Sequence, residues 1–365
     1  DEEGQAKFVG YRVMAYRIAL MTGTGVVVTI GAVVSWSLAF LVSAGLLAGL
    51  LVFHTLFLPR VEKQRRPLMA LPKVKVLLGG VVFAAVTVGV RAALGSSLYR
   101  SLVEDVPVVR ELDFASLTGL ALVTALVVLG ALRHRIRRLL TRHPDSFYSR
   151  AFLSFMDRDR VGVLLAFIVF IRTGEFMLSS MVGPFMVDLG AKAHYGWISG
   201  GVGLPCSIFG ALAGGWMISR YTLRKMIWPF LLAQNLTNVV YMVLALAMEG
   251  WIHKNTGGGV TVSPGGAGLL AITAVHGFDQ IASGLGTAVL MTYLMRICKK
   301  EHKASHYAIA TGLMAVSGLF AGVAGGFLAA WLGYGYFFGV SFLFSVPGMI
   351  LVLFLPHREP PDTNG

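Results

Sequence analysis

The chain has 365 residues, of which 56% are hydrophobic and only 13% are charged, and its mean hydropathy is +0.72. Soluble globular proteins are about half apolar and about a quarter charged, so this composition excludes an ordinary soluble domain. The formal net charge of +13 would point to nucleic-acid binding in a soluble chain. Here the basic residues follow the topology of a membrane protein, so we expect the lipid bilayer, and no nucleic acid, as a partner.

Apolar stretches of about 20 residues, the length that a helix needs to cross the hydrocarbon core, recur along the whole chain. They are continuous rather than alternating, which excludes a transmembrane strand barrel. The sequence therefore predicts an all-α polytopic membrane helical bundle with about ten transmembrane helices. The expected spans are 8–32, 36–58, 74–97, 114–133, 161–186, 196–218, 226–249, 267–295, 305–331 and 334–356.

Most lysine and arginine residues lie on one side of these spans. The opposite side has only Arg100, Arg110, Lys192 and Lys254, while Arg91 and Arg172 lie within spans. Short cytoplasmic loops carry an excess of basic residues, so we expect both termini in the cytoplasm.

The spans fall into three groups along the chain. Residues 1–58 form a two-helix unit, and residues 59–160 hold a second helix pair followed by a basic cytoplasmic linker from about 134. Residues 161–358 contain six spans with short cytoplasmic connections. We expect this last group to form a compact six-helix bundle.

Polar residues within the six-span group recur at helical spacing. Residues three or four apart share one face of a helix, and a carboxylate at membrane depth survives only if it faces protein or water. Three spans each carry such a face, which is what a central cavity for a polar solute requires. Their members are Arg172 and Glu175, then Gln234, Asn238 and Tyr241, and then His276, Asp279, Gln280, Ser283 and Thr287.

The roles expected for these residues differ. Asn238 is best explained as an interhelical hydrogen-bonding residue, a structural role that is common in membrane bundles. Arg172 can neutralise Glu175 as an intramembrane ion pair. For Glu175 and Asp279 we favour a functional role, because carboxylates in such places commonly relay protons.

A cytoplasmic loop in the same group carries a more specific motif. Residues 210–225, which include Gly210, Gly214, Arg220, Arg224 and Lys225, resemble the Gly-xxxx-Asp-Arg-x-Gly-Arg-Arg loop that closes the cytoplasmic gate in the major facilitator superfamily. Ser219 stands where that motif has its acid, and Thr222 stands where it has a glycine. The loop lies between the second and third spans of the six, which is its position in that family.

The wider resemblance is to the muropeptide permease (AmpG-like) branch of the major facilitator superfamily, which also includes acetyl-coenzyme A transporters. It is carried by the segments 10–12, 172–175 with 184–190, 278–288 with 294–298, and 305–308, which resemble parts of the fifth, seventh, tenth and eleventh helices. The helix pair at 74–133 resembles the inserted pair of this branch. By this resemblance the family's first four helices precede residue 10 and are missing from the sequence, so the fold is a partial one of this type.

The resemblance implies a transporter in the bacterial cytoplasmic (inner) membrane that imports anhydromuramyl disaccharide peptides, as part of peptidoglycan recycling, by symport with protons. Glu175 and Asp279 would then couple protons or contact substrate. Arg172 would balance Glu175 or hold an anionic group, and Arg12 could also face the cavity. The amide side chains of Gln234, Asn238 and Gln280, together with His276, would bind the sugar or the peptide.

Three alternatives remain open at this stage. One is transport of another amphiphilic solute, such as a peptide conjugate or acetyl-coenzyme A. Another is a non-transporting membrane receptor or assembly protein. A membrane-embedded transferase is the third, but no second acid or base accompanies the histidines at a span end, so we do not expect an enzyme. We expect no cofactor and no metal, since Cys206 and Cys298 fit neither a disulfide nor a metal-ligand pattern.

Overall fold

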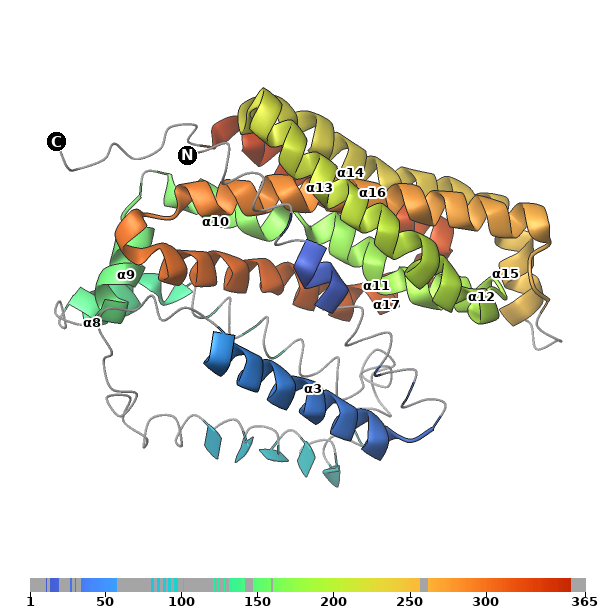
Figure 1. Cartoon of the computed structure of the whole chain (residues 1–365), viewed down its shortest axis with the longest axis horizontal. Helices are drawn as coiled ribbons and strands as arrows, with labels where there is room; N and C mark the ends of the chain where they lie inside the picture. Colours follow the sequence, from blue (N-terminus) through green and yellow to red (C-terminus); the bar gives the residue numbers. More distant parts are fainter. Residues whose placement is uncertain are drawn as a thin grey trace. The chain divides into compact units, whose positions relative to one another are not determined.

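The computed structural model describes residues 34–57, 131–141, 147–158, 160–256 and 262–355, with residues 11, 14–19, 27 and 30 and scattered positions between 80 and 128. All regular structure in these ranges is helical, as the composition predicts. The chain forms two compact units, one of residues Val26–Leu122 and one of Asp1–Gly25 together with Val123–Gly365. Figure 1 shows their helices.

The smaller unit contains α3 (Trp36–Phe57), which confirms the span expected at 36–58. Of its side chains only Ala39 is buried, and its large apolar residues are exposed nearly all the way round. Such a surface is stable in contact with lipid tails rather than with water. The spans expected at 8–32, 74–97 and 114–133 lie mostly outside the described residues.

The larger unit contains the six-span bundle. Its helices are α10 (Val161–Phe170), α11 (Thr173–Asp188), α12 (Lys192–Trp197), a π-helical segment (Ile198–Gly203), α13 (Leu204–Tyr221), α14 (Leu223–Ala247), α15 (Glu249–Thr256), α16 (Gly266–Ile297) and α17 (Lys303–Leu351), with short 3-10 turns at Lys300–His302 and Val352–Phe354.

Five helical segments in the described part of the chain are long and apolar enough to cross a membrane: Trp36–Phe57, Val161–Asp188, Lys192–Tyr221, Leu223–Ala247 and Lys303–Phe354. α16 has 32 residues and so is also long enough, but its polar and glycine residues make it less apolar than these five. α17 holds the two spans that we expected at 305–331 and 334–356. Its continuity is broken at Gly333, whose φ of 73° lies in the left-handed region that favours glycine.

Close helix packing builds the bundle. α13 packs along α16, α11 and α10 pack along α17, and α14 contacts both α16 and α17. Where α13 crosses α16, a Cβ added to Gly284 would lie 2.6 Å from the backbone nitrogen of Ala211 and 2.8 Å from the carbonyl carbon of Gly210. Gly210 and Gly284 therefore allow the two backbones to touch, as small residues do in membrane bundles.

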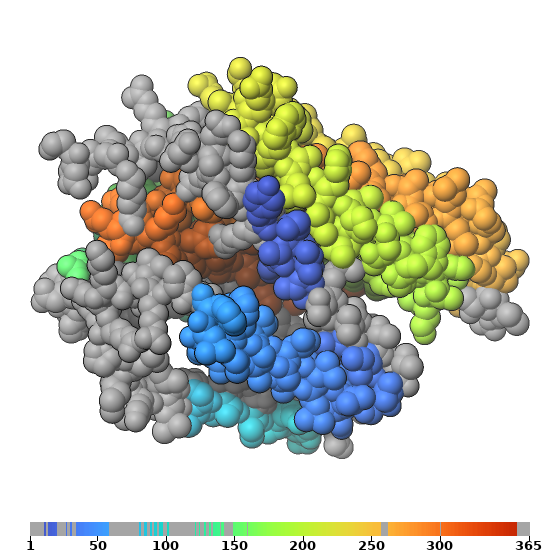
Figure 2. Space-filling model, viewed as in Figure 1, coloured from blue at the N-terminus to red at the C-terminus, as the bar shows by residue number. Residues whose placement is uncertain are grey.

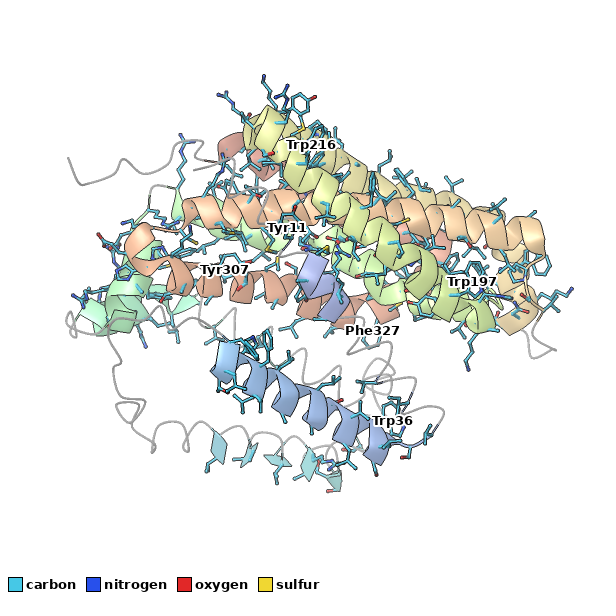
Figure 3. All side chains as sticks on the ribbon, viewed as in Figure 1. Tyr11, Trp36, Trp197, Trp216, Tyr307 and Phe327 are labelled. Carbon is cyan, nitrogen blue, oxygen red and sulfur yellow. The ribbon has the colours of Figure 1, made fainter. Side chains whose placement is uncertain are left out.

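The ends of one segment carry exposed tryptophans. Trp197 and Trp216 lie near opposite ends of Lys192–Tyr221, and Figure 3 shows them well separated. At 1.5 Å per residue they are about 28 Å apart along the helix axis, close to the thickness of the hydrocarbon core. Between them the π-helical segment and α13, yellow-green in Figure 2, form part of an outer surface on which Phe209 is 63% exposed. This pattern fits a membrane-spanning segment with aromatic residues at both interfaces.

The described parts of the basic linker are helical and partly docked. α8 (Arg133–Thr141) precedes α9 (Phe147–Met156), and Phe155 of α9 is buried in the core of the bundle. His306, at the start of α17, is fully buried and contacts the Ser154 hydroxyl oxygen through Nε2 at 2.8 Å. Its Nδ1 accepts hydrogen bonds from Arg158, at 2.7 Å, and from the backbone N–H of Lys299, at 3.3 Å. These contacts hold the linker against the turn between α16 and α17.

Candidate functional site

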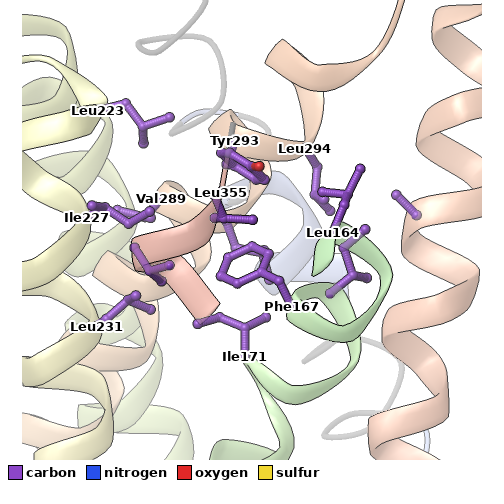
Figure 4. Packing of buried hydrophobic residues seen from close by; sticks show 14 of the residues in the cluster. Leu164, Phe167, Ile171, Leu223, Ile227, Leu231, Val289, Tyr293, Leu294 and Leu355 are labelled. Carbon is purple, nitrogen blue, oxygen red and sulfur yellow. The ribbon is translucent and has the colours of Figure 1, made fainter. Parts of the chain in front are cut away.

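Two apolar clusters lie toward opposite ends of the bundle helices, and buried polar residues separate them on each helix. The first cluster includes Phe167, Ile171, Leu231 and Tyr293, all of which are labelled in Figure 4. The second includes Met177, Phe185, Tyr241 and Phe338. We call the residues between the clusters the polar layer. Its members are Arg172, Thr173, Glu175, Gln234, Asn238, His276, Asp279, Ser283, Thr287, Ser317 and Ser341.

A break in a membrane span brings Arg172 into this layer. We expected one continuous helix at 161–186, but α10 ends at Phe170 and α11 starts at Thr173. Arg172 between them has φ −111° and ψ 3°, outside the helical region. The Val169 carbonyl near the break accepts hydrogen bonds from the Thr173 hydroxyl, at 2.9 Å, and from the Ser317 hydroxyl. Polar side chains thus satisfy backbone groups that lipid could not.

Glu175 lies at the centre of the layer and is 8% exposed. The expected ion pair with Arg172 is present, with 2.5 Å between Arg172 Nη2 and Glu175 Oε1. The Ser283 hydroxyl donates to the same oxygen at 2.6 Å, and the side-chain amide of Gln234 donates to Oε2. Residues of α14 and α16 thus bind both oxygens of a carboxylate carried by α11, which sequence spacing alone could not predict.

The second acid, Asp279, is 5% exposed and accepts a hydrogen bond from Gln280 Nε2 at 3.1 Å. One turn earlier on α16, the Nδ1 atom of His276 lies 2.9 Å from the Tyr241 hydroxyl. The Nε2 atom of His276 is buried and has no hydrogen-bond partner in the described ranges. It faces the end of the π-helical segment, because a Cβ added to Gly203 would lie 2.8 Å from it.

Sequence reasoning missed Arg17 as a site residue. The segment 14–19, dark blue in Figure 1, is helical, and Arg17 Nη2 donates to Ser283 Oγ at 2.9 Å and to Thr287 Oγ1 at 3.3 Å. We had assigned Arg17 to the cytoplasmic basic residues and had proposed Arg12 as cavity-facing; Arg12 lies outside the described residues. The available signal was an arginine well inside an apolar span, which is costly unless it meets polar groups.

Asn238 has the interhelical role that we expected. Its side-chain Oδ1 accepts a hydrogen bond from Ser341 Oγ of α17 at 2.7 Å, and its Nδ2 donates to the backbone of its own helix. This contact ties α14 to the second half of α17 at the level of the polar layer.

The residues of the gate motif divide into two sets. Gly210 and Gly214 lie within α13 and face α16, so they contribute to helix packing. The basic residues Arg220, Arg224 and Lys225 are exposed on both sides of the tight turn between α13 and α14. Thr222 forms this turn with φ 73° and ψ 150°, a conformation that suits the glycine of the motif better than a β-branched residue.

In the described part of the chain, no three His, Cys, Asp or Glu side chains come together in a way that could hold a metal ion. The polar layer itself offers carboxylates that can bind protons and hydrogen bonds from guanidinium, amide and hydroxyl groups.

Comparison with known proteins agrees with this architecture. The Major Facilitator Superfamily model matches residues 163–365. The anhydromuropeptide permease of Escherichia coli (strain K12) is 26% identical over 201 residues, covering 54% of this chain and 37% of that protein. Putative transporter AmpG 2 of Rickettsia typhi (strain ATCC VR-144 / Wilmington) is 22% identical over 220 residues, covering 60% and 49%. This chain thus spans less than half the length of these two relatives.

The matched region contains most of α10, all of α11 to α17 and the polar layer, except for the contribution of Arg17. The membrane-spanning helices and the helical bundle with its polar layer are what the family match, which covers more than half of the chain, leads one to expect. The protein is a multi-pass membrane protein that belongs to the Major Facilitator Superfamily.

Proposed function

We propose that this protein is a proton-coupled secondary transporter that imports cell-wall sugar-peptides, the anhydromuramyl disaccharide peptides, across the bacterial inner membrane. The observation that carries the proposal is the polar layer, in which two buried carboxylates from α11 and α16 lie between two apolar clusters. The names of the relatives support the choice of cargo. We further propose that both termini are cytoplasmic and that residues 161–358 form the carboxy-terminal half of the transporter.

Proton binding at Glu175 would change interactions on three helices at once. The ionised carboxylate accepts hydrogen bonds from Arg172, Ser283 and Gln234. Such charge-assisted bonds are about twice as strong as neutral ones, so protonation weakens the contact of α11 with α14 and α16. A ligand shifts a conformational equilibrium only through such differential interactions. Glu175 thus provides a route from proton binding to helix movement.

Asp279 is the second proposed coupling acid, and the neighbouring polar side chains are proposed to bind the cargo. Gln280 and His276 flank Asp279 on α16, and His276 has an unused ring nitrogen among the described residues. The exposed basic residues Arg220, Arg224 and Lys225 beside Thr222 are proposed to form the cytoplasmic gate.

The test uses the full-length protein in proteoliposomes with a labelled anhydrodisaccharide tripeptide. In Glu175→Gln and Asp279→Asn variants we expect uptake driven by an imposed pH gradient to be lost, while exchange of labelled for unlabelled solute continues. Glu249→Gln is the matched control, because Glu249 is an exposed acid at the start of α15, with its side chain 61% exposed.

Two results would contradict parts of the proposal. Gradient-driven uptake that persists in both acid variants would remove these residues from proton coupling. Failure of the wild-type protein to take up any sugar-peptide, alongside uptake of a coenzyme A thioester, would replace the cargo but keep the transport mechanism.

A further inference from the structure

Arg17 brings a second guanidinium into the polar layer, and its partners there are uncharged. Its Nη2 atom donates to the hydroxyls of Ser283 and Thr287, at 2.9 and 3.3 Å. Among the described residues, no carboxylate lies in ion-pair contact with it. Arg17 is half-buried. A guanidinium stays charged under all ordinary conditions, and a charge partly removed from water is stabilised by a counter-charge or strong hydrogen bonds.

Neither acid of the polar layer supplies a counter-charge to Arg17 by direct contact. Both oxygens of Glu175 are occupied by Arg172, Ser283 and Gln234. Asp279 accepts from Gln280, and both acids, Glu175 more strongly than Asp279, attract Arg17 through longer-range electrostatics without direct contact. Arg17 therefore has donor capacity that the described protein atoms do not use.

Hydroxyl groups of α16 orient the guanidinium of Arg17 within the polar layer. Thr287 Oγ1 accepts from Arg17 Nη2 and also from Arg172 Nη1, at 3.4 Å, so two guanidiniums from different segments converge on one side chain. Thr287 in turn donates to the Ser283 backbone carbonyl at 2.7 Å, which fixes its orientation. Ser283 and Thr287 act here as positioning residues.

We propose that Arg17 is the receptor for a carboxylate group of the transported solute. A guanidinium presents a planar fork of donors that matches a carboxylate with two parallel hydrogen bonds. In this arrangement Arg172 neutralises the coupling acid Glu175, and Arg17 neutralises the cargo. The inference rests on the proposed transport function and adds to it that the cargo must be an anion.

The test has two arms and uses the full-length protein in nanodiscs at constant ionic strength. The first arm measures thermal stabilisation by millimolar succinate and by its uncharged analogue succinamide. The second measures binding of a labelled anhydrodisaccharide tripeptide and of the same compound with its carboxylates converted to carboxamides. Each arm compares wild type with Arg17→Gln, Arg17→Lys and the control Arg137→Gln, whose side chain is 60% exposed on α8.

We expect the wild type and the Arg137 control to be stabilised by succinate only, and to bind the carboxylate tripeptide at least about tenfold more tightly than its amide. Arg17→Gln should show neither preference. Arg17→Lys should keep a reduced preference, since lysine retains the charge without the fork. The lysine variant also keeps the test decisive if the glutamine variant does not fold.

The outcomes separate this inference from the proposed function. Carboxylate preference that is the same in all four proteins, or absent in both arms, overturns the anion receptor. Tripeptide binding with no preference for its carboxylates overturns the receptor and leaves the sugar-peptide cargo in place. An Arg17-dependent succinate effect without any tripeptide binding supports the receptor and overturns the cargo.

Discussion

Replacing Thr222 by glycine should stabilise the protein, because the turn between α13 and α14 forces this residue into a backbone conformation that a Cβ opposes. Its φ of 73° and ψ of 150° fall in a region that is essentially restricted to glycine and costs other residues about 1–3 kcal/mol. Glycine would lose about 0.5–1 kcal/mol in chain entropy. Thr222 is exposed and makes no capping hydrogen bond through its side chain, so few contacts are lost. We expect a net gain of about 1 kcal/mol.

A gain of this size raises the melting temperature by roughly 2–4 °C in a domain of some 150–250 residues. The measurement is thermal unfolding of the purified protein in detergent, followed by tryptophan fluorescence. Thr222→Ala is the matched control, because alanine keeps the Cβ and with it the steric conflict. An equal gain in the alanine variant, or a lower melting temperature in the glycine variant, would refute the argument from backbone strain.

Three further predictions concern packing and reactivity. Gly284→Ala should destabilise the bundle by about 1–3 kcal/mol in the same melting assay, because the added Cβ overpacks against the α13 backbone. Gly322→Ala is the control: nothing lies within 4 Å of its added Cβ, so it should be neutral or slightly stabilising. His306→Ala should free α9, which limited proteolysis of the linker would detect as faster cleavage; unchanged cleavage would show that the buried histidine does not hold it. Burial raises the pKa of the Cys298 thiol to about 11. In a Cys206→Ser background, maleimide should therefore label Cys298 about 100-fold more slowly at neutral pH than an ordinary thiol, and the labelling rate should keep rising above pH 9. A plateau near pH 9 would contradict this.

Much of the fold follows from hydropathy. A membrane span is a long-range average over about 20 residues, which is why the expected span at 36–58 and the observed α3 agree so closely. The interruption at Ile171–Arg172 was not predicted, because neither proline nor glycine marks it. Its stabilising contact with Ser317 comes from a distant part of the chain.

The candidate site was predictable in part for a similar reason. Helical spacing places His276, Asp279, Ser283 and Thr287 of α16 on one face, and all four are buried. Spacing within a helix does not give its rotation relative to its neighbours, so the contact between Gln234 and Glu175 could not be foreseen. Arg17 was missed because the charge asymmetry grouped it with the cytoplasmic basic residues, although it lies well inside the expected span 8–32.

The contacts that build the polar layer also stabilise the bundle, and this decides how its function can be probed. Truncating Glu175 would leave Arg172 as an unpaired buried charge, and breaking a buried pair in that way typically costs about 3–5 kcal/mol. Loss of transport in Glu175→Ala would then report unfolding as readily as lost coupling. Glutamine also removes the negative charge, but unlike alanine it keeps the shape and one acceptor oxygen for Ser283 or Arg172, so it leaves no cavity while removing the titratable proton site. Only the isosteric variants therefore separate the proton chemistry of the layer from its role in holding α11, α14 and α16 together.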